Sequence, residues 1–190
     1  MALSDRPAER HQQVAGLFTE RVRATRSWDA PSPVPGWAAR DVVRHLTDWF
    51  PAFLVSGTGI DLPRGPSVDD NPVAAWQVHC DGVQAVLDDP ETAHRELANP
   101  HIGRLPLATA IDQFYTADVF MHTWDLSRST GQDDRLDPGF CAQLLGGMEP
   151  IEEVMRSSGQ YGPRVEVPDD ADTQTRLLGF IGRDPFWPAR

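Results

Sequence analysis

Apolar positions recur every three or four residues in two segments near the start of the chain. Residues 7–27 carry this spacing and predict an amphipathic helix with Pro7 in its first turn. A second helix is predicted to start near Trp37 and to be ended or kinked by Pro51. Between the two, residues 29–36 hold three prolines and predict an ordered, extended loop.

Four further helical segments follow, separated by stretches rich in Gly, Pro and Asp. They cover about residues 72–88, 107–129, 138–156 and 171–181. Gly131 stands where a C-cap belongs, and Asp137 with Pro138 is placed to start the following helix. Residues 57–72 form a connection long enough to cross the end of a bundle, and residues 91–106 are expected to be loop.

This succession of helices predicts an all-α fold. A chain of 190 residues with 40% hydrophobic composition can bury one continuous core, so a single domain over residues 1–190 is expected. Four main helices would form a bundle over about residues 7–130, and residues 131–190 would add a short helical C-terminal extension.

Charge and composition exclude several classes of partner. A net charge of -11 without any Arg-rich run argues against nucleic acid, and no apolar stretch is long enough for a membrane span or a signal peptide. We therefore expect a cytoplasmic protein, as a monomer or homodimer. Cys80 and Cys141 are too few for a disulfide framework, and the absence of Lys excludes Schiff-base chemistry by lysine.

Two polar residues lie on the apolar stripe of the segment 107–129. Ile111, Tyr115, Asp118, His122 and Leu126 follow helical spacing, so Asp118 and His122 should face the core. A lone buried carboxylate costs roughly several kcal/mol unless it is paired or binds a metal. Residues four apart stack on adjacent turns, so both side chains could hold one ion or could simply hydrogen-bond each other.

His45 adds a third candidate ligand, because it also lies among apolar neighbours on a helix that a bundle would bring beside Asp118 and His122. Taken alone, it could be a core histidine with an ordinary hydrogen bond. Two imidazoles and one carboxylate leave positions open for water or substrate, which is typical of catalytic rather than structural zinc. The same donors also occur in non-haem iron sites, but those are usually built on β-scaffolds.

Other polar residues have more ordinary interpretations. Asp125 and Asp48 could orient an imidazole, yet a helical Asp near a C-terminus is usually solvated. Arg183 is expected to pair locally with Asp184, or alternatively to bind an anionic substrate. His79 and Cys80 are chain neighbours that cannot face each other on a helix.

The loop histidines and the tryptophans also have ordinary structural interpretations. His94 and His101 precede the segment 107–129 and could approach an open metal site, although loop histidines are more often exposed. Tryptophans are expected in the bundle core and as loop anchors rather than in a ligand cage. These are Trp28, Trp37, Trp49, Trp76 and Trp124.

Three separated motifs carry a family resemblance. They are W-D-A-P-S-P-V-P-G-W-A-A-R-D-V-V-R-H-L at residues 28–46, D-V-F-M-H-T-W-D-L at 118–126 and G-R-D-P at 182–185. In this order they resemble the mycothiol-dependent maleylpyruvate isomerase family of the DinB-like metalloenzyme superfamily. The resemblance implies a DinB-like four-helix bundle with one long crossover and a divalent metal, usually zinc, held at the positions of His45, Asp118 and His122.

The resemblance also implies a low-molecular-weight thiol, such as mycothiol, as cosubstrate. A thiolate would attack a small electrophile, giving either a stable adduct or, after bond rotation and elimination, an isomer. We therefore expect a metal-dependent thiol S-transferase or thiol-dependent isomerase; the alternative is a non-catalytic metal- or small-ligand-binding protein. The chain lacks the long C-terminal domain of the full isomerase, and fold does not fix substrate, so neither the electrophile nor any catalytic residue is assigned.

Overall fold

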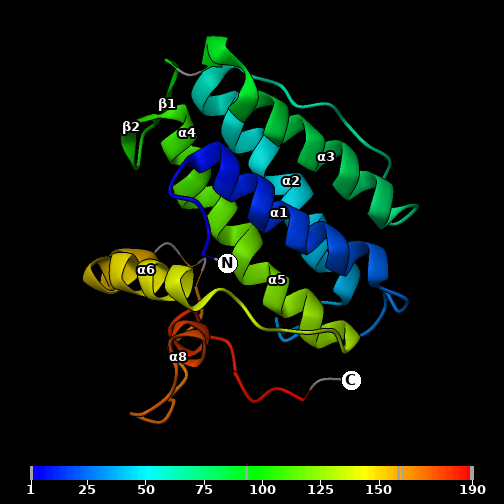
Figure 1. Ribbon diagram of the computed structural model, residues 1–190, viewed down its shortest axis with the longest axis vertical. Helices are drawn as coiled ribbons and strands as arrows, with labels where there is room; N and C mark the ends of the chain where they lie inside the picture. Colours follow the sequence, from blue (N-terminus) through cyan, green and yellow to red (C-terminus); the bar gives the residue numbers. More distant parts are fainter. Residues whose placement is uncertain (1, 93, 158, 160, 189–190) are drawn as a thin grey trace.

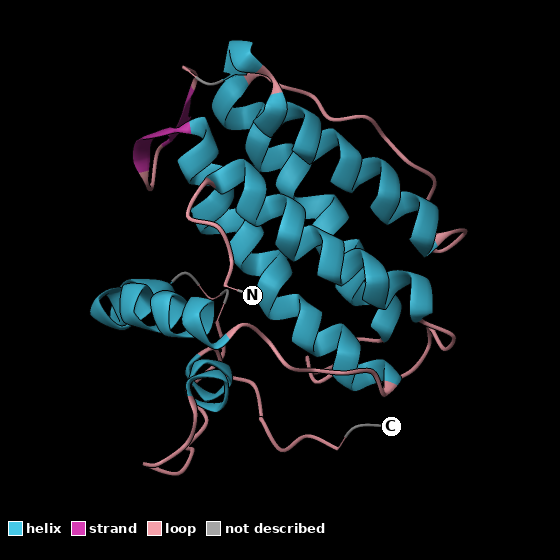
Figure 2. Cartoon of the chain, viewed as in Figure 1, coloured by secondary structure: helices cyan, strands magenta, loops and turns pink. Residues whose placement is uncertain are grey.

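Helices account for most of the chain, as the sequence predicts, and one small sheet accompanies them among the described residues (Figure 2). The structure is a computed structural model, and it describes residues 2–92, 94–157, 159 and 161–188. Among these residues, no helix combines the length and the apolar character that crossing a bilayer requires. The predominance of helices confirms the all-α prediction at the level of fold class.

Four helices form the main bundle (Figure 1). They are α1 (Pro7–Ala24), α2 (Ala39–Thr58), α3 (Pro72–Asp88) and α5 (Ala117–Thr130). Helices α1 and α2 each pack against both α3 and α5, so the four form a closed ring with α1 and α2 at opposite corners. Large side chains from all four fill the space inside; the most completely buried include Phe18, Phe50, Trp76 and Trp124.

Helix α2 begins at a cap and runs past its proline. The carboxylate of Asp41 accepts a hydrogen bond from the Ala38 backbone N–H (2.8 Å), which satisfies a donor that the first turn leaves free. Of the two outcomes predicted for Pro51, the end of the helix is wrong, because α2 continues to Thr58, whereas the kink stays a prediction. Leu54 lies beyond Pro51 and is fully buried, so packing of the last turns outweighs the lost hydrogen bond.

The connection between α2 and α3, residues 59–71, runs along the length of α3 rather than across the bundle end (Figure 1). Two glycines allow this close approach. A Cβ on Gly65 would lie 3.1 Å from Ala75 Cα, and one on Gly82 would lie 2.9 Å from Pro63 Cδ. The connection therefore returns the chain to the far end of the bundle before α3 begins.

The segment 91–106, expected to be loop, contains a short antiparallel hairpin. Strands β1 (Glu96–Asn99) and β2 (Gly103–Pro106) pair with Asn99 opposite Gly103, after a 3-10 turn at Pro90–Thr92. The loop prediction is wrong because strands of four residues are too short to show alternation. Leu97 anchors the hairpin: its side chain is fully buried at the position where Gly57 of α2 leaves room.

The segment 107–129 is helical throughout, but its middle is not α-helical. Helix α4 (Leu107–Ala110) leads into a π-helical stretch, η2 (Ile111–Thr116), which continues directly into α5. Gly131 ends α5 in the left-handed conformation (φ 66°), as its predicted role as C-cap requires. Wider π turns inside helices occur frequently at functional sites.

The C-terminal part forms a second group of helices beside the bundle (Figure 1). Helix α6 (Pro138–Met148) starts at the predicted Asp137 cap, and α8 (Thr173–Phe180) packs against it. The helix expected to reach residue 156 is interrupted at its middle by a 3-10 turn (Glu149–Ile151) before α7 (Glu152–Ser157). Pro150 accounts for this break, because it cannot donate a backbone hydrogen bond.

Two histidines lie in the bundle core without an ionic partner. His11 of α1 and His79 of α3 are 0% and 4% exposed, and their rings lie 5.7 and 5.4 Å from the Tyr115 ring. Burial lowers the pKa of His11 to about 3, with a smaller contribution from His79, and burial lowers the pKa of His79 to about 4. Both imidazoles are therefore neutral in the folded protein near pH 7.

These lowered pKa values predict acid sensitivity of the fold. Below about pH 6.5 these two imidazoles bind protons in the unfolded chain but stay neutral in the folded chain. The free energy of unfolding therefore falls as the pH decreases toward the folded pKa values. When the pH falls from 7 to 5, each of the two histidines should lower the free energy of unfolding by about 2 kcal/mol. Urea unfolding across this range, with metal removed by chelator, measures the effect.

A matched pair of variants tests the assignment. His79→Leu should remove about half of the added acid sensitivity, because one of the two histidines no longer takes up a proton on unfolding. Substitution of exposed His94 by Gln should leave the pH dependence unchanged. Equal pH slopes in the wild type and His79→Leu would contradict the prediction.

Candidate metal centre

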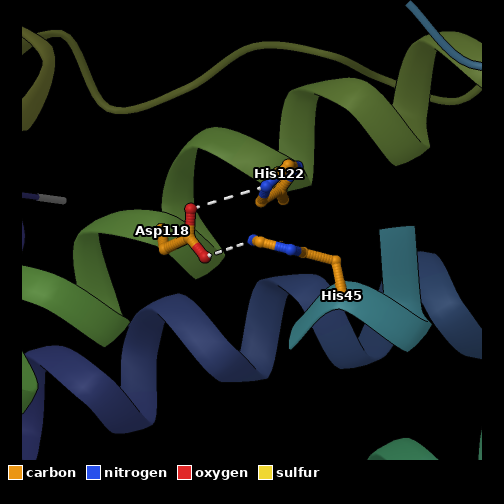
Figure 3. A group of neighbouring side chains, drawn as sticks. All are labelled: His45, Asp118 and His122. Carbon is orange, nitrogen blue, oxygen red and sulfur yellow. Dashed lines mark hydrogen bonds and ion pairs between the residues drawn. The ribbon is translucent and has the colours of Figure 1, made fainter. Parts of the chain in front are cut away.

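Asp118, His122 and His45 come together on the inner faces of two neighbouring helices (Figure 3). Helix α5 supplies Asp118 and His122 from adjacent turns, and α2 supplies His45. Oδ2 of Asp118 lies 3.0 Å from Nε2 of His45, and Oδ1 lies 3.4 Å from Nε2 of His122. One ligand atom from each of the three residues falls within 4.8 Å of the others.

The group is open on the side of α2. The side chain of His122 is only 6% exposed and that of Asp118 is 17% exposed, whereas His45 retains 33%. The accessible surface of the group therefore lies mainly at His45, while His122 is almost completely covered. This arrangement suits a site that keeps a position for water or substrate.

Polar neighbours offset the cost of placing the charged Asp118 carboxylate inside the bundle. Besides the two imidazoles, Nε1 of Trp49 donates to Oδ2 of Asp118 at 2.9 Å. Burial by itself raises the pKa of Asp118, but His122, His45 and the indole N–H together lower it below its ordinary value. The carboxylate is therefore ionised, as a metal ligand must be.

Asp125 belongs to the same network: of its two interpretations, the structure supports the acceptor for an imidazole and not the solvated carboxylate. Its carboxylate is fully buried, and Oδ2 lies 2.8 Å from Nδ1 of His122. Because a carboxylate can only accept, Nδ1 carries a proton, and Nε2 is the ring nitrogen that faces Asp118. Asp48, the other candidate for this role, is exposed as expected.

Arg183 pairs with Asp125 and not with Asp184, so the predicted local ion pair is wrong. Nε of Arg183 lies 2.9 and 3.2 Å from the two oxygens of Asp125, and Nη2 lies 3.0 Å from Oδ2. Asp184 instead accepts from the backbone N–H of Phe186. The two partners are 58 residues apart, and no local sequence pattern connects them.

Aromatic rings enclose the group. The Trp37 ring lies 5.8 Å from that of His122 in a stacked arrangement and 5.2 Å from that of His45. Trp76 and Trp124 are core residues as expected, but Trp37 and Trp49 line the site. Burial, together with the Asp118 carboxylate, raises the pKa of Tyr161 to about 12, so its phenol is neutral.

The remaining histidines take no part. His94 and His101 are exposed near the hairpin, and His79 lies in the core; none belongs to the group of ligand atoms found among the described residues. The possible approach of His94 or His101 to the site is thus not seen. Sequence reasoning placed the three candidate ligands together and named Asp125 as a possible support, but it missed Arg183 and Trp49 in that role.

The donor set fits a divalent ion such as zinc. Bonds of about 2.0–2.2 Å to a tetrahedral ion separate neighbouring ligand atoms by about 3.3–3.5 Å. One ligand atom from each of the three residues lies within 4.8 Å of the other two, so the side chains need to draw in only slightly to reach that spacing. A buried carboxylate that fixes the Nδ1–H tautomer of a histidine is also the usual outer support of a metal ligand.

Fold and site together define a helical protein with a candidate centre of two histidines and one carboxylate. The chain is 24% identical over 182 residues to uncharacterized proteins from two strains of Mycobacterium tuberculosis, covering 93% of this chain and 97% of theirs. No family model matches the chain. No solved structure matches it either.

Zinc titration tests the centre directly. One ion per chain should bind, with ligand distances of about 2.0–2.2 Å by X-ray absorption. His45→Ala, Asp118→Asn and His122→Ala should each weaken binding by more than the ~10–100-fold that losing an outer partner costs. The exposed His101→Ala serves as control. Tight binding that survives all three substitutions would place the ion elsewhere.

Metal occupancy should also depend on pH. Imidazoles coordinate only when neutral, so at low free zinc the occupancy should fall as pH drops below about 6.5, the ordinary histidine value. Chelator competition at pH 7.5, 6.5 and 5.5 measures this loss. Circular dichroism at each pH separates metal release from unfolding. Occupancy that stays constant while the fold is intact would show that histidines are not the ligands.

Proposed function

We propose that this chain is a divalent-metal-dependent enzyme, a thiol S-transferase or thiol-dependent isomerase, with a DinB-like bundle and zinc as the metal. Mycothiol or a similar thiol would be the cosubstrate, and a small electrophile the substrate. The observation that carries the proposal is the three-ligand group with its exposed side at His45. A site that only stabilised the fold would be expected to have four protein ligands.

The positions of the three resemblance motifs support this proposal. The segment 28–46 provides Trp37 and His45, the segment 118–126 provides Asp118 and His122, and G-R-D-P provides Arg183. All of these residues lie in one connected network. The ring of four helices and the long connection 59–71 likewise agree with the DinB-like topology that the resemblance implies.

The residues have distinct roles in the proposed chemistry. His45, Asp118 and His122 would hold the ion, and a bound divalent ion lowers the pKa of a thiol and so favours the nucleophilic thiolate. Asp125 keeps Nδ1 of His122 protonated, so that Nε2 is free to coordinate. Trp37 covers the two imidazoles and limits the access of water from its side.

Thiol-dependent turnover tests the proposal. Zinc-loaded protein with mycothiol, or a surrogate thiol, should convert members of an electrophile panel that includes alkylating agents and cis-alkene diacids. His122→Ala should lower turnover to the background rate, because the ion would lose a ligand. Its circular dichroism and thermal melting, measured without metal in both proteins, should stay close to wild type.

Two outcomes would contradict the proposal. Zinc-loaded protein that protects only a stoichiometric amount of electrophile, without turnover, would indicate the non-catalytic binding protein. Full activity of His122→Ala would remove this histidine from the reaction. Activity with Fe²⁺ and oxygen but without thiol would instead support the iron-site alternative.

A further inference from the structure

We propose that Arg183 is a positioning residue of the metal centre. Its guanidinium holds the buried carboxylate of Asp125, and Asp125 in turn fixes the tautomer and ring orientation of His122. This inference rests on the proposed metal binding, but it concerns residues that do not touch the ion. The C-terminal extension then contributes a residue that supports metal binding.

Asp125 depends on Arg183 for compensation of its charge. Its carboxylate is fully buried on α5, where an uncompensated negative charge is costly. Burial raises the pKa of Asp125, whereas Arg183 and His122 lower it below its usual range. His122 must stay neutral to bind metal, so the permanent positive charge comes from Arg183.

The geometry suits arginine specifically. Nε and Nη2 lie 2.9 and 3.0 Å from different oxygens of Asp125, which is the two-point contact that a planar guanidinium makes with a carboxylate. This contact prevents rotation of the carboxylate and leaves Oδ2 directed at Nδ1 of His122. A lysine would supply a charge but could not fix both oxygens.

The backbone that follows α8 positions Arg183. Gly182 has φ +84°, and a Cβ there would lie 3.0 Å from both Gly162 Cα and Pro163 O, so only glycine fits. The Arg183 backbone N–H then donates to Leu178 O at 2.9 Å, which closes the last turn. The side chain is 16% exposed and reaches back to α5.

Arg128 provides a matched control, because it also joins α5 to the C-terminal segment but away from the centre. Its Nη2 donates to Pro185 O at 2.9 Å, and its side chain pairs with Asp134. Arg128→Gln therefore removes a comparable contact without touching Asp125 or His122. A loss seen with Arg183→Gln and absent from Arg128→Gln reports on the centre rather than on docking of the extension.

Two measurements test the inference. Zinc affinity, by chelator competition, should fall about 10–100-fold in Arg183→Gln and less in Arg183→Lys. In metal-free protein, nitrogen-15 NMR should show a proton held on Nδ1 of His122 in the wild type and a smaller share of protonated Nδ1 in Arg183→Gln. Asp125→Asn should weaken zinc binding too, and adding Arg183→Gln to it should have little further effect, since both act through one path.

The outcomes separate this inference from the proposed function. Zinc affinity and His122 tautomer both unchanged in Arg183→Gln, or changed equally in Arg128→Gln, would overturn it. If the wild type binds no metal, the proposed function fails, and the NMR result on metal-free protein alone decides the role of Arg183. If Arg183→Gln does not fold, Arg183→Lys takes its place, and wild-type zinc affinity with a wild-type tautomer in that variant would overturn the inference.

Discussion

The constraint on which the site depends is the ionised carboxylate of Asp118 on the inner face of α5. A carboxylate there is costly unless every oxygen has a partner, and the partners come from α2 as well as from α5 itself. Nε2 of His45 and Nε1 of Trp49 both lie on α2 and both reach the same oxygen. Pairing of α2 with α5 is thus tied to one register, in which His45 lies opposite Asp118.

A second carboxylate on α5, that of Asp125, ties the C-terminal extension to this helix in the same way. Asp125 lies seven residues after Asp118, two turns along the same helix, and its cationic partner is Arg183. Helix α5 therefore carries two negative charges, the partly buried Asp118 compensated by the bundle and the fully buried Asp125 compensated by the extension. His122 lies between them and contacts both, so the two parts of the chain meet at a single imidazole.

Sequence periodicity was sufficient to place the long helices and the three candidate ligands. The bounds of α3 and the Gly131 and Asp137 caps follow from local signals, and Asp118 and His122 stand out as polar residues on an apolar stripe. Long-range partners leave no such signal. The solvated interpretation of Asp125 was favoured because its cationic partner, Arg183, lies 58 residues away, and the hairpin formed by β1 and β2 depends on the space beside Gly57.

Four of the six histidines lie on inward-facing sides of bundle helices, and only their partners distinguish them. Nε2 of His11 and of His79 has no hydrogen-bond partner among the described residues, and burial lowers the pKa of both imidazoles. His45 and His122, by contrast, each lie against a carboxylate. An apolar stripe with a histidine therefore does not by itself predict a ligand. The discriminating feature is a carboxylate on the same or a neighbouring stripe, because it supplies the charge that attracts a cation and the acceptor that selects the imidazole tautomer.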